Sequence, residues 1–243
     1  MCGRYAALRD AVEIAEYFAA EQLPLSSQDE GRAPTRLPTI PDYNVTPTRE
    51  VFIVMEDQGT RRVDSARWGL IPSWSKDASR SARMINARSE TVSDKPAYRS
   101  AFRRRRCLVP ADGYYEWQAR EGAVKQPFFF HDASSRPLAL AGLYEDWPGP
   151  EGLVRSCTIV TQDARGVLAR IHDRMPVLVD PTHWSAWLDP ATDDPDSLLA
   201  RVLADGAVEE LLTYPVSTLV NKPGNNGPEV LAPVDIDGAR PAT

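Results

Sequence analysis

A series of short apolar and aromatic segments between residues 51 and 179 constrains the fold of this chain most strongly. Each segment has three to seven residues and is rich in β-branched or aromatic side chains. The segments are Val51–Met55, Arg62–Trp68, Arg106–Val109, Tyr114–Trp117, Phe128–Phe130, Leu138–Tyr144, Ser156–Thr161 and Val177–Val179. Because such runs are typical of β-strands, the sequence predicts a mostly antiparallel sheet that is strongly bent into a barrel-like core.

Other segments carry apolar residues at helical spacing. Asp10 and Glu13 form a capping pair, and the apolar residues that follow them predict a short helix over 10–20. Further helices are predicted over 163–170, 182–188 and 196–204. Strands and flanking helices together predict an α+β fold class.

The strand runs are evenly spaced, and no segment between them has the composition of a linker. We therefore expect a single domain over residues 1–243. Residues 21–42 hold four prolines among Ser, Arg and Asp, a composition that is typical of a flexible surface loop. A frayed tail is expected over about 234–243.

Hydrophobic residues make up 42% of the 243 residues, which is enough to bury a core without disulfides. No stretch approaches the ~18 consecutive apolar residues of a membrane span, and the N-terminal residues lack the pattern of an export signal. The three cysteines form no CxxC pair, and Cys107 and Cys157 lie within apolar strand runs, where core thiols are expected. The sequence thus predicts a soluble, cytoplasmic monomer with no membrane partner.

The common cofactor and metal motifs are missing from the sequence. There is no GxxxxGK[ST], GxGxxG, GxSxG or HExxH motif, and no pair of histidines has the spacing of metal ligands. We therefore expect neither a nucleotide cofactor nor a metal site.

Charge is distributed unevenly along the chain. Residues 76–106 contain ten basic and three acidic side chains, a net charge of +7, whereas the whole chain carries −6. A basic segment of this kind can bind a phosphate backbone, and Trp68, Trp74 and Trp117 could stack on unpaired bases. The alternative is a solvated basic face with tryptophans in the core. Spacing alone leaves both interpretations open.

Cys2 directly follows the initiator methionine and has a small side chain. Aminopeptidases remove Met1 when the next residue is small. Removal would expose an α-amine with a pKa near ~7.7–8 and a thiol with a pKa near ~8.5 on one residue. This pair can attack a carbonyl carbon as an N-terminal nucleophile, with the amine as base. Alternatively, the amine condenses with an aldehyde to an imine, and the thiolate closes on it to form a thiazolidine. A cysteine without function is the third interpretation.

Three further side chains are candidates for the same chemistry. Glu116 lies among aromatic residues, where desolvation would raise its pKa and suit it to proton transfer. His172 lies between a predicted helix and a predicted strand and could act as a general acid, and Asn86 could orient an amine or a carbonyl. The alternatives are an outward-facing strand residue for Glu116, a helix cap for His172 and a turn former for Asn86.

Six motifs occur in the order in which one known family carries them. They are Met1–Tyr5 (MCGRY), Tyr43–Pro47 (YNVTP), Trp68–Trp74 (WGLIPSW), Asn86–Thr91 (NARSET), Cys107–Trp117 (CLVPADGYYEW) and Ile171–Pro176 (IHDRMP). With these motifs the chain resembles the SOS-response-associated peptidase (SRAP) family from residue 2 to about residue 233. The resemblance implies a bent, barrel-like α+β fold and a protein that recognises abasic sites in single-stranded DNA.

The resemblance also implies a reaction and its catalytic residues. After loss of Met1, Cys2 would form a thiazolidine with the ring-opened deoxyribose aldehyde and shield the lesion at stalled replication forks, without a cofactor. Asn86 would position the amine, Glu116 would transfer protons, and His172 would assist ring opening and reversal of the crosslink. The family name leaves an alternative, an N-terminal-nucleophile cysteine peptidase, whose activity could be limited to removal of its own Met1. Reversal of the crosslink would count as lyase activity.

The DNA contacts that the resemblance implies fall into two groups. The DNA backbone would be held by Arg4, Arg88, Lys95, Thr161 and Arg174. The kinked strand near the lesion would be shaped by Asn44, Pro47, Trp68 and Trp117. The partner would be single-stranded DNA with abasic sites, met in the cytoplasm at the nucleoid and the replication fork.

Overall fold

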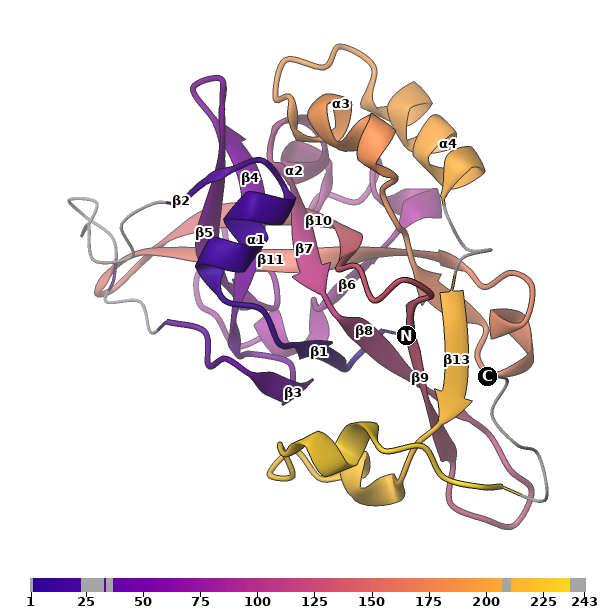
Figure 1. Cartoon of the computed structure of the whole chain (residues 1–243). Coiled ribbons are helices and arrows are strands. Elements are labelled where there is room, and N and C mark those ends of the chain that lie inside the picture. The colour runs from indigo at the N-terminus through magenta and orange to yellow at the C-terminus, as the bar shows by residue number, and fades with distance from the viewer. Residues whose placement is uncertain (1, 23–32, 34–36, 207–210, 237–243) are drawn as a thin grey trace.

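The computed structural model describes residues 2–22, 33, 37–206 and 211–236 (Figure 1). Among these residues it contains two β-sheets, four α-helices and six short 3-10 helices. The fold class is α+β, as the mixture of strand and helix patterns predicted.

The larger sheet has eight strands, of which seven lie side by side in the order β12-β11-β10-β7-β4-β5-β2. They are β12 (Arg174–Pro176), β11 (Gly152–Asp163), β10 (Leu138–Gly149), β7 (Arg106–Ala111), β4 (Glu50–Asp57), β5 (Thr60–Trp68) and β2 (Glu21–Gln22). The eighth strand, β6 (Asn86–Arg88), pairs with β11. β5 also pairs with β11 in parallel, with Trp68 beside Cys157. This pairing closes β11, β10, β7, β4 and β5 into a ring and confirms the predicted barrel-like core.

Alternate side chains of the ring strands face two different apolar clusters. In β4, Val51, Ile53 and Met55 belong to one cluster, whereas Phe52 and Val54 belong to the other. The first, which we call the interior cluster, takes one face of all five ring strands and therefore fills the ring. The second, the exterior cluster, joins the opposite faces of these strands to the helices.

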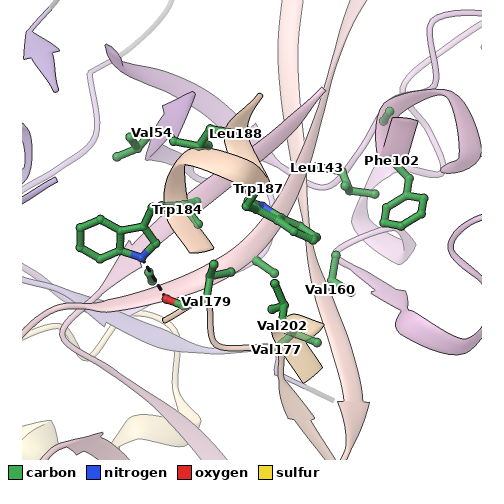
Figure 2. Close-up of a cluster of buried hydrophobic side chains, with 14 of the residues drawn as sticks. Val54, Phe102, Leu143, Val160, Val177, Val179, Trp184, Trp187, Leu188 and Val202 are labelled. Atoms are coloured by element: carbon green, nitrogen blue, oxygen red, sulfur yellow. Dashed lines mark hydrogen bonds between the residues drawn. The ribbon is translucent and has the colours of Figure 1, made fainter. Parts of the chain in front are cut away.

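The helices cover the exterior cluster. They are α1 (Ala11–Tyr17), α2 (Arg99–Arg104), α3 (Trp184–Leu188) and α4 (Pro195–Asp205). Figure 2 shows Trp187 of α3 among apolar side chains of the ring and α4, while the indole N–H of Trp184 donates to the carbonyl oxygen of Val179. α1 begins at the predicted capping box, in which Asp10 and Glu13 each accept the backbone N–H of the other residue.

The smaller sheet has the order β13-β9-β8-β1-β3. Its strands are β13 (Leu211–Pro215), β9 (Gln126–Asp132), β8 (Gly113–Gln118), β1 (Tyr5–Ala7) and β3 (Asp42–Val45). One face adds Tyr5, Tyr114 and Phe130 to the interior cluster. The other face packs against two C-terminal 3-10 helices, η5 (Thr218–Asn221) and η6 (Pro228–Leu231), which are yellow in Figure 1.

Seven of the eight predicted strand runs are confirmed, within the bounds of β4, β5, β7, β8, β9, β10 and β11. The run 177–179 is not a named strand, because β12 ends at Pro176 and Leu178 forms only an isolated bridge with Leu140. The patterns missed β1, β2, β3, β6, β12 and β13, which have two to five residues each. Runs this short carry too few side chains to establish an alternation.

The helices predicted over 10–20, 182–188 and 196–204 are confirmed as α1, α3 and α4. The helix predicted over 163–170 is wrong, since β11 extends to Asp163 and only η3 (Leu168–Arg170) follows it. The other 3-10 helices are η1 (Ser81–Arg83), η2 (Ser89–Thr91) and η4 (Pro181–His183).

The predicted loop at 21–42 and the predicted tail at 234–243 lie largely outside the described residues. The described ends of the loop segment are β2 and the first residue of β3, Asp42. Within the described residues, no helix combines the length and the apolar composition that crossing a membrane requires.

Gly113→Ala tests the packing at the start of β8. A Cβ atom at Gly113 would collide with the carbonyl oxygen of Phe130 and the ring of Phe129, and a backbone oxygen cannot move aside cheaply. We expect the free energy of unfolding to fall by roughly 1–3 kcal/mol in urea denaturation. Gly224→Ala is the control, because no atom lies within 4 Å of its added Cβ. Equal stability of the two variants would contradict the close packing of β8 on β9.

Candidate functional site

The four predicted chemical residues come from two parts of the fold that meet. Cys2 precedes β1 and Glu116 lies in β8, so both belong to the smaller sheet. Asn86 begins β6 and His172 lies between η3 and β12, so both belong beside β11 of the larger sheet. The structure brings all four together at the junction of the two sheets, through the contacts described next.

Pairing of β1 with β8 brings Cys2 toward Glu116. The two strands are antiparallel, with Tyr5 opposite Tyr114, and the amide of Tyr115 donates to the carbonyl oxygen of Arg4 at 2.9 Å. Residues that precede Tyr5 therefore lie beside residues that follow Tyr114. Cys2 has no exposed surface and belongs to the interior cluster.

Asn86 holds the backbone of Cys2 from the opposite side. Its Nδ2 donates to the carbonyl oxygen of Cys2 at 2.9 Å, and its own carbonyl oxygen accepts from the hydroxyl of Tyr98 at 3.2 Å. The Oδ1 atom of Asn86 is buried and has no hydrogen-bond partner among the described residues. Asn86 thus fixes Cys2 and retains an acceptor for an N–H group.

Glu116 is the buried carboxyl of the site. Its Oε2 lies 3.7 Å from Nε2 of His172, and only 2% of the residue is exposed. Burial raises the pKa of Glu116 to about 7, because desolvation disfavours the charged form. The group is therefore near half protonation at neutral pH, where it can both give and accept a proton.

His172 is held at its other ring nitrogen. The backbone N–H of Arg174 donates to Nδ1 at 3.0 Å, which favours the neutral ring with its hydrogen on Nε2, toward Glu116. The exposed carboxylate of Asp173 lies 2.9 Å from Nδ1 and favours the charged ring. Partial burial has the larger effect and lowers the pKa of His172.

Burial also determines the state of the Cys2 thiol. Desolvation raises its pKa above the ordinary value, and negative charge on Glu116 raises it further, whereas a hydrogen bond with the backbone of Arg4 acts in the opposite direction. The thiol is therefore neutral at neutral pH. It reacts as a thiolate only when a nearby group takes its proton, and the half-protonated Glu116 is suited to that task.

The other two cysteines have a structural place. Cys107 and Cys157 are fully buried free thiols on β7 and β11, as the strand patterns predicted. Among the residues that the structure describes, no group of three or more His, Cys, Asp or Glu side chains could hold a metal ion.

Five of the nine predicted DNA contacts are exposed or half-buried. Arg88 and Lys95 are exposed, and Arg4, Pro47 and Trp117 are half-buried. The Arg4 guanidinium lies 5.8 Å from the centre of a Trp117 ring, and the Trp117 indole donates to Asn221 Oδ1 at 2.7 Å. The Arg4 guanidinium also donates to Asn44 Oδ1 and to the carbonyl oxygen of Val220, each at 2.7 Å, so Arg4 is engaged with its own chain.

The structure places three of the predicted DNA contacts in the interior. Trp68 has no exposed surface, and its indole N–H donates to the carbonyl oxygen of Ile85. Thr161 is 1% exposed. Asn44 is 3% exposed, and its Nδ2 donates to carbonyl oxygens of the C-terminal segment at residues 220, 222 and 225. A contact with DNA stays a prediction for these three residues.

Arg174 is engaged with its own chain. Its guanidinium makes two hydrogen bonds with Glu90, at 2.7 and 3.0 Å, and one with Asp163 at 2.5 Å. It also donates to the carbonyl oxygen of Thr161. Its side chain is 10% exposed, so a contact with DNA stays a prediction for Arg174. The pairing of Arg174 with Glu90 leaves no local signal in the sequence, since 84 residues separate the two.

The basic segment is mostly on the surface, with one exception. Arg106 is 1% exposed, and its three guanidinium nitrogens donate to four backbone carbonyl oxygens, which makes it a structural residue. Trp74 is the exposed tryptophan of the three candidates, at 67%. It borders a pocket of about 540 Å³, where Lys76 and Arg80 lie over apolar side chains such as Ile71.

Comparisons with known proteins add four findings. A family model described as SOS response associated peptidase (SRAP) matches residues 1–223. Abasic site processing protein YoqW of Bacillus subtilis is 39% identical over 233 residues, which cover 95% of this chain and 99% of that protein. Abasic site processing protein YoaM of the same organism is 37% identical over 232 residues, covering 95% and 97%. A crystal structure of a Bacteroides thetaiotaomicron protein matches with a TM-score of 0.80 at 23% identity, covering 96% of this chain and 100% of that one, which supports the fold alone.

Glu116→Gln tests the desolvation of the buried carboxyl. Below the unfolded pKa of a carboxyl, near 4.5, the group is neutral in both states and its ionisation does not affect the free energy of unfolding. For Glu116 this free energy falls as pH rises from there through the folded pKa of about 7. The free energy of unfolding of the variant should therefore exceed that of wild type by on the order of 3 kcal/mol at pH 8, and by about 1 kcal/mol or less at pH 5. Denaturation in urea at both pH values measures this difference.

Glu145→Gln is the matched control for this measurement. Glu145 is equally buried, but its Oε1 accepts a hydrogen bond from Arg105 Nη2 at 2.5 Å. Loss of that charge should lower the free energy of unfolding at both pH values, since the guanidinium then loses its partner. If Glu116→Gln were destabilising at pH 8 in the same way, the description of Glu116 as a desolvated carboxyl would be wrong.

Proposed function

Because the chain belongs to the SOS response associated peptidase (SRAP) family, we propose that it processes abasic sites in DNA by covalent attachment through Cys2. The proposal rests chiefly on one observation, the convergence of Cys2, Asn86, Glu116 and His172 at a buried junction. Relatives that are named abasic site processing proteins support the substrate class.

The reaction begins when removal of Met1 gives Cys2 a free α-amine beside its thiol. An abasic deoxyribose is mostly a closed hemiacetal, so a proton donor and a proton acceptor must open it to the aldehyde. His172 and Glu116 lie 3.7 Å apart and both have a pKa near neutrality or below it, so one can donate while the other accepts. The amine then attacks C1 of the aldehyde in its neutral form.

Two bonds to C1 of the aldehyde form in turn. The amine nitrogen bonds to C1, and the aldehyde oxygen leaves as water after it has received two protons, which gives an imine. The sulfur of Cys2 then bonds to C1, the S–H bond breaks, and the electron pair of the C=N π bond returns to nitrogen. Nitrogen takes up the thiol proton, for which Glu116 is the carrier in this proposal. Amine and thiol belong to one residue, so ring closure has a high effective concentration.

Asn86 has a positioning role in this scheme. It binds the carbonyl oxygen of Cys2 through Nδ2, and its buried Oδ1 can accept a hydrogen bond from the new amine. This arrangement orients the nitrogen lone pair toward the aldehyde carbon and removes the need to order the N-terminal residue during the reaction.

The DNA strand would be held by the exposed part of the basic segment. Arg88 and Lys95 follow Asn86 in the chain and are exposed, so they can bind phosphates beside the site. Trp74, rather than Trp68, offers a stacking platform, with Lys76 and Arg80 at the same pocket. Arg4, Pro47, Trp117 and Arg174 remain proposed contacts near the lesion.

Crosslinking to an abasic site tests the covalent step. Wild-type protein with single-stranded DNA that carries one abasic site should give an adduct that survives a denaturing gel, and intact DNA should give none. Cys2→Ser retains the amine, so it should give an adduct only after reduction of the imine with borohydride. Wild-type adduct no more abundant than that of Cys2→Ala would contradict the proposal, as would a fully retained Met1 in an intact-mass measurement.

The same assay separates the alternatives. Salt-sensitive but wholly reversible binding would indicate a plain single-strand binder. Cys2-dependent cleavage of peptides without DNA would instead support the peptidase activity that the family description names. Release of Met1 alone would show self-processing and nothing further.

Arg88→Ala tests the DNA surface. Loss of one phosphate contact should weaken binding to intact single-stranded DNA and reduce the slope of log K against log salt by about 0.7. Fluorescence anisotropy between 50 and about 200 mM salt measures both quantities. Arg201→Ala, an exposed arginine of α4 outside the basic segment, is the control and should leave the slope unchanged. An equal slope for Arg88→Ala and wild type would remove Arg88 from the interface.

A further inference from the structure

Tyr114 is a fully buried residue of β8 whose hydroxyl is left without a partner. The side chain has no exposed surface, and its oxygen makes no hydrogen bond among the described residues. A buried hydroxyl without a partner costs stability, so native structures retain few of them and usually for a reason. The neighbouring Tyr115 shows the ordinary arrangement, since its hydroxyl donates to the carbonyl oxygen of Tyr43 at 2.7 Å.

The position of Tyr114 relates it to the reacting groups. Residues 114 and 116 lie on one face of β8, whereas Tyr115 lies on the opposite face with the C-terminal segment. Tyr114 stands opposite Tyr5 in the strand register and shares the interior cluster with Cys2. Its ring stacks on Phe130, with centroids 5.0 Å apart and planes 13° apart, which holds the hydroxyl in a fixed direction.

The electrostatics agree with this placement. Burial raises the pKa of Tyr114 well above its ordinary value, and negative charge on Cys2 or Glu116 raises it further. The phenol therefore keeps its proton and can serve only as a neutral hydrogen-bonding group. Tyr5 is the other tyrosine that responds to charge on Cys2, but Cys157 and Asp42 affect its pKa more strongly.

We propose that the Tyr114 hydroxyl donates a hydrogen bond to the Cys2 sulfur as the thiol loses its proton, a role that rests on the proposed function. In the ring-closing step the S–H bond breaks and the S–C1 bond forms, while the phenol O–H bond stays intact. The sulfur is the group that needs a donor, because burial disfavours its charged form and the Arg4 backbone is the one favourable hydrogen bond it has among the described residues. Tyr114 is thus a positioning residue that makes the thiolate accessible at lower pH.

Tyr114→Phe removes only the hydroxyl. We expect single-turnover crosslinking to abasic single-stranded DNA to slow about tenfold at pH 7, because a hydrogen bond to a charged group is lost. The pH at which the rate is half-maximal should rise by about one unit, as a tenfold change implies. The thermal midpoint should stay equal to that of wild type or rise, since no hydrogen bond within the described residues is lost.

Tyr115→Phe is the matched control on the same strand. It loses the hydrogen bond to Tyr43, so its thermal midpoint should fall while its pH profile stays that of wild type. A wild-type rate and pH profile for Tyr114→Phe would overturn the proposal. So would a lower thermal midpoint together with an unshifted pH profile, which would make Tyr114 a structural residue.

A second measurement separates this proposal from the function on which it rests. Glycolaldehyde also forms a thiazolidine with an N-terminal cysteine, and intact mass follows that reaction across the same pH range without DNA. If wild type fails to crosslink DNA but reacts with glycolaldehyde, the proposed function is wrong, and a shifted profile of Tyr114→Phe still supports the role of Tyr114. An unshifted glycolaldehyde profile would overturn that role.

Discussion

The antiparallel pairing of β1 with β8 is the interaction on which the candidate site depends. Its register, with Tyr5 opposite Tyr114, places Glu116 on the face that meets the barrel interior. A slip of one residue would turn Glu116 toward the C-terminal 3-10 helices and remove it from Cys2. Because β1 has only three residues, the hydrogen bond from Asn86 on the larger sheet supplies the second attachment of Cys2. The site therefore exists only when both sheets are formed and joined.

Desolvation at this junction affects every group of the site in a consistent direction. It raises the pKa of Glu116 to about 7, raises that of the Cys2 thiol and lowers that of His172. The Cys2 thiol and His172 therefore favour their neutral forms near neutral pH, whereas Glu116 is near half protonation and can give or accept a proton. Condensation with an aldehyde needs a neutral amine, so an environment that disfavours charge suits the first step, whereas ring closure needs a group that takes the thiol proton.

Much of the barrel could be predicted from local pattern, whereas its closure could not. Alternation along runs such as 51–55 predicts strands, because each side chain meets one of two clusters. The parallel contact of β5 with β11, which closes the ring, joins residues about ninety positions apart and leaves no local signal. Cys2, Asn86, Glu116 and His172 were identified by resemblance and residue type. Their contacts depend on that closure. The burial of Trp68 depends on it too, so spacing alone left its position open.

Hydrogen-bond satisfaction separates the structural polar residues from those available for chemistry. Asn44 and Arg106 are buried, but their donors reach backbone carbonyl oxygens, so each is complete without a ligand. Asn86 Oδ1 and the Tyr114 hydroxyl are also buried, but neither makes a hydrogen bond among the described residues; Asn86 binds the carbonyl oxygen of Cys2 through Nδ2, and Tyr114 shares the interior cluster with Cys2. Since a buried polar group without a partner lowers stability, a bound substrate that supplies the missing partners of these two groups would offset that cost. The acidic net charge of the chain carries no such information, because it averages a basic surface segment with an acidic remainder.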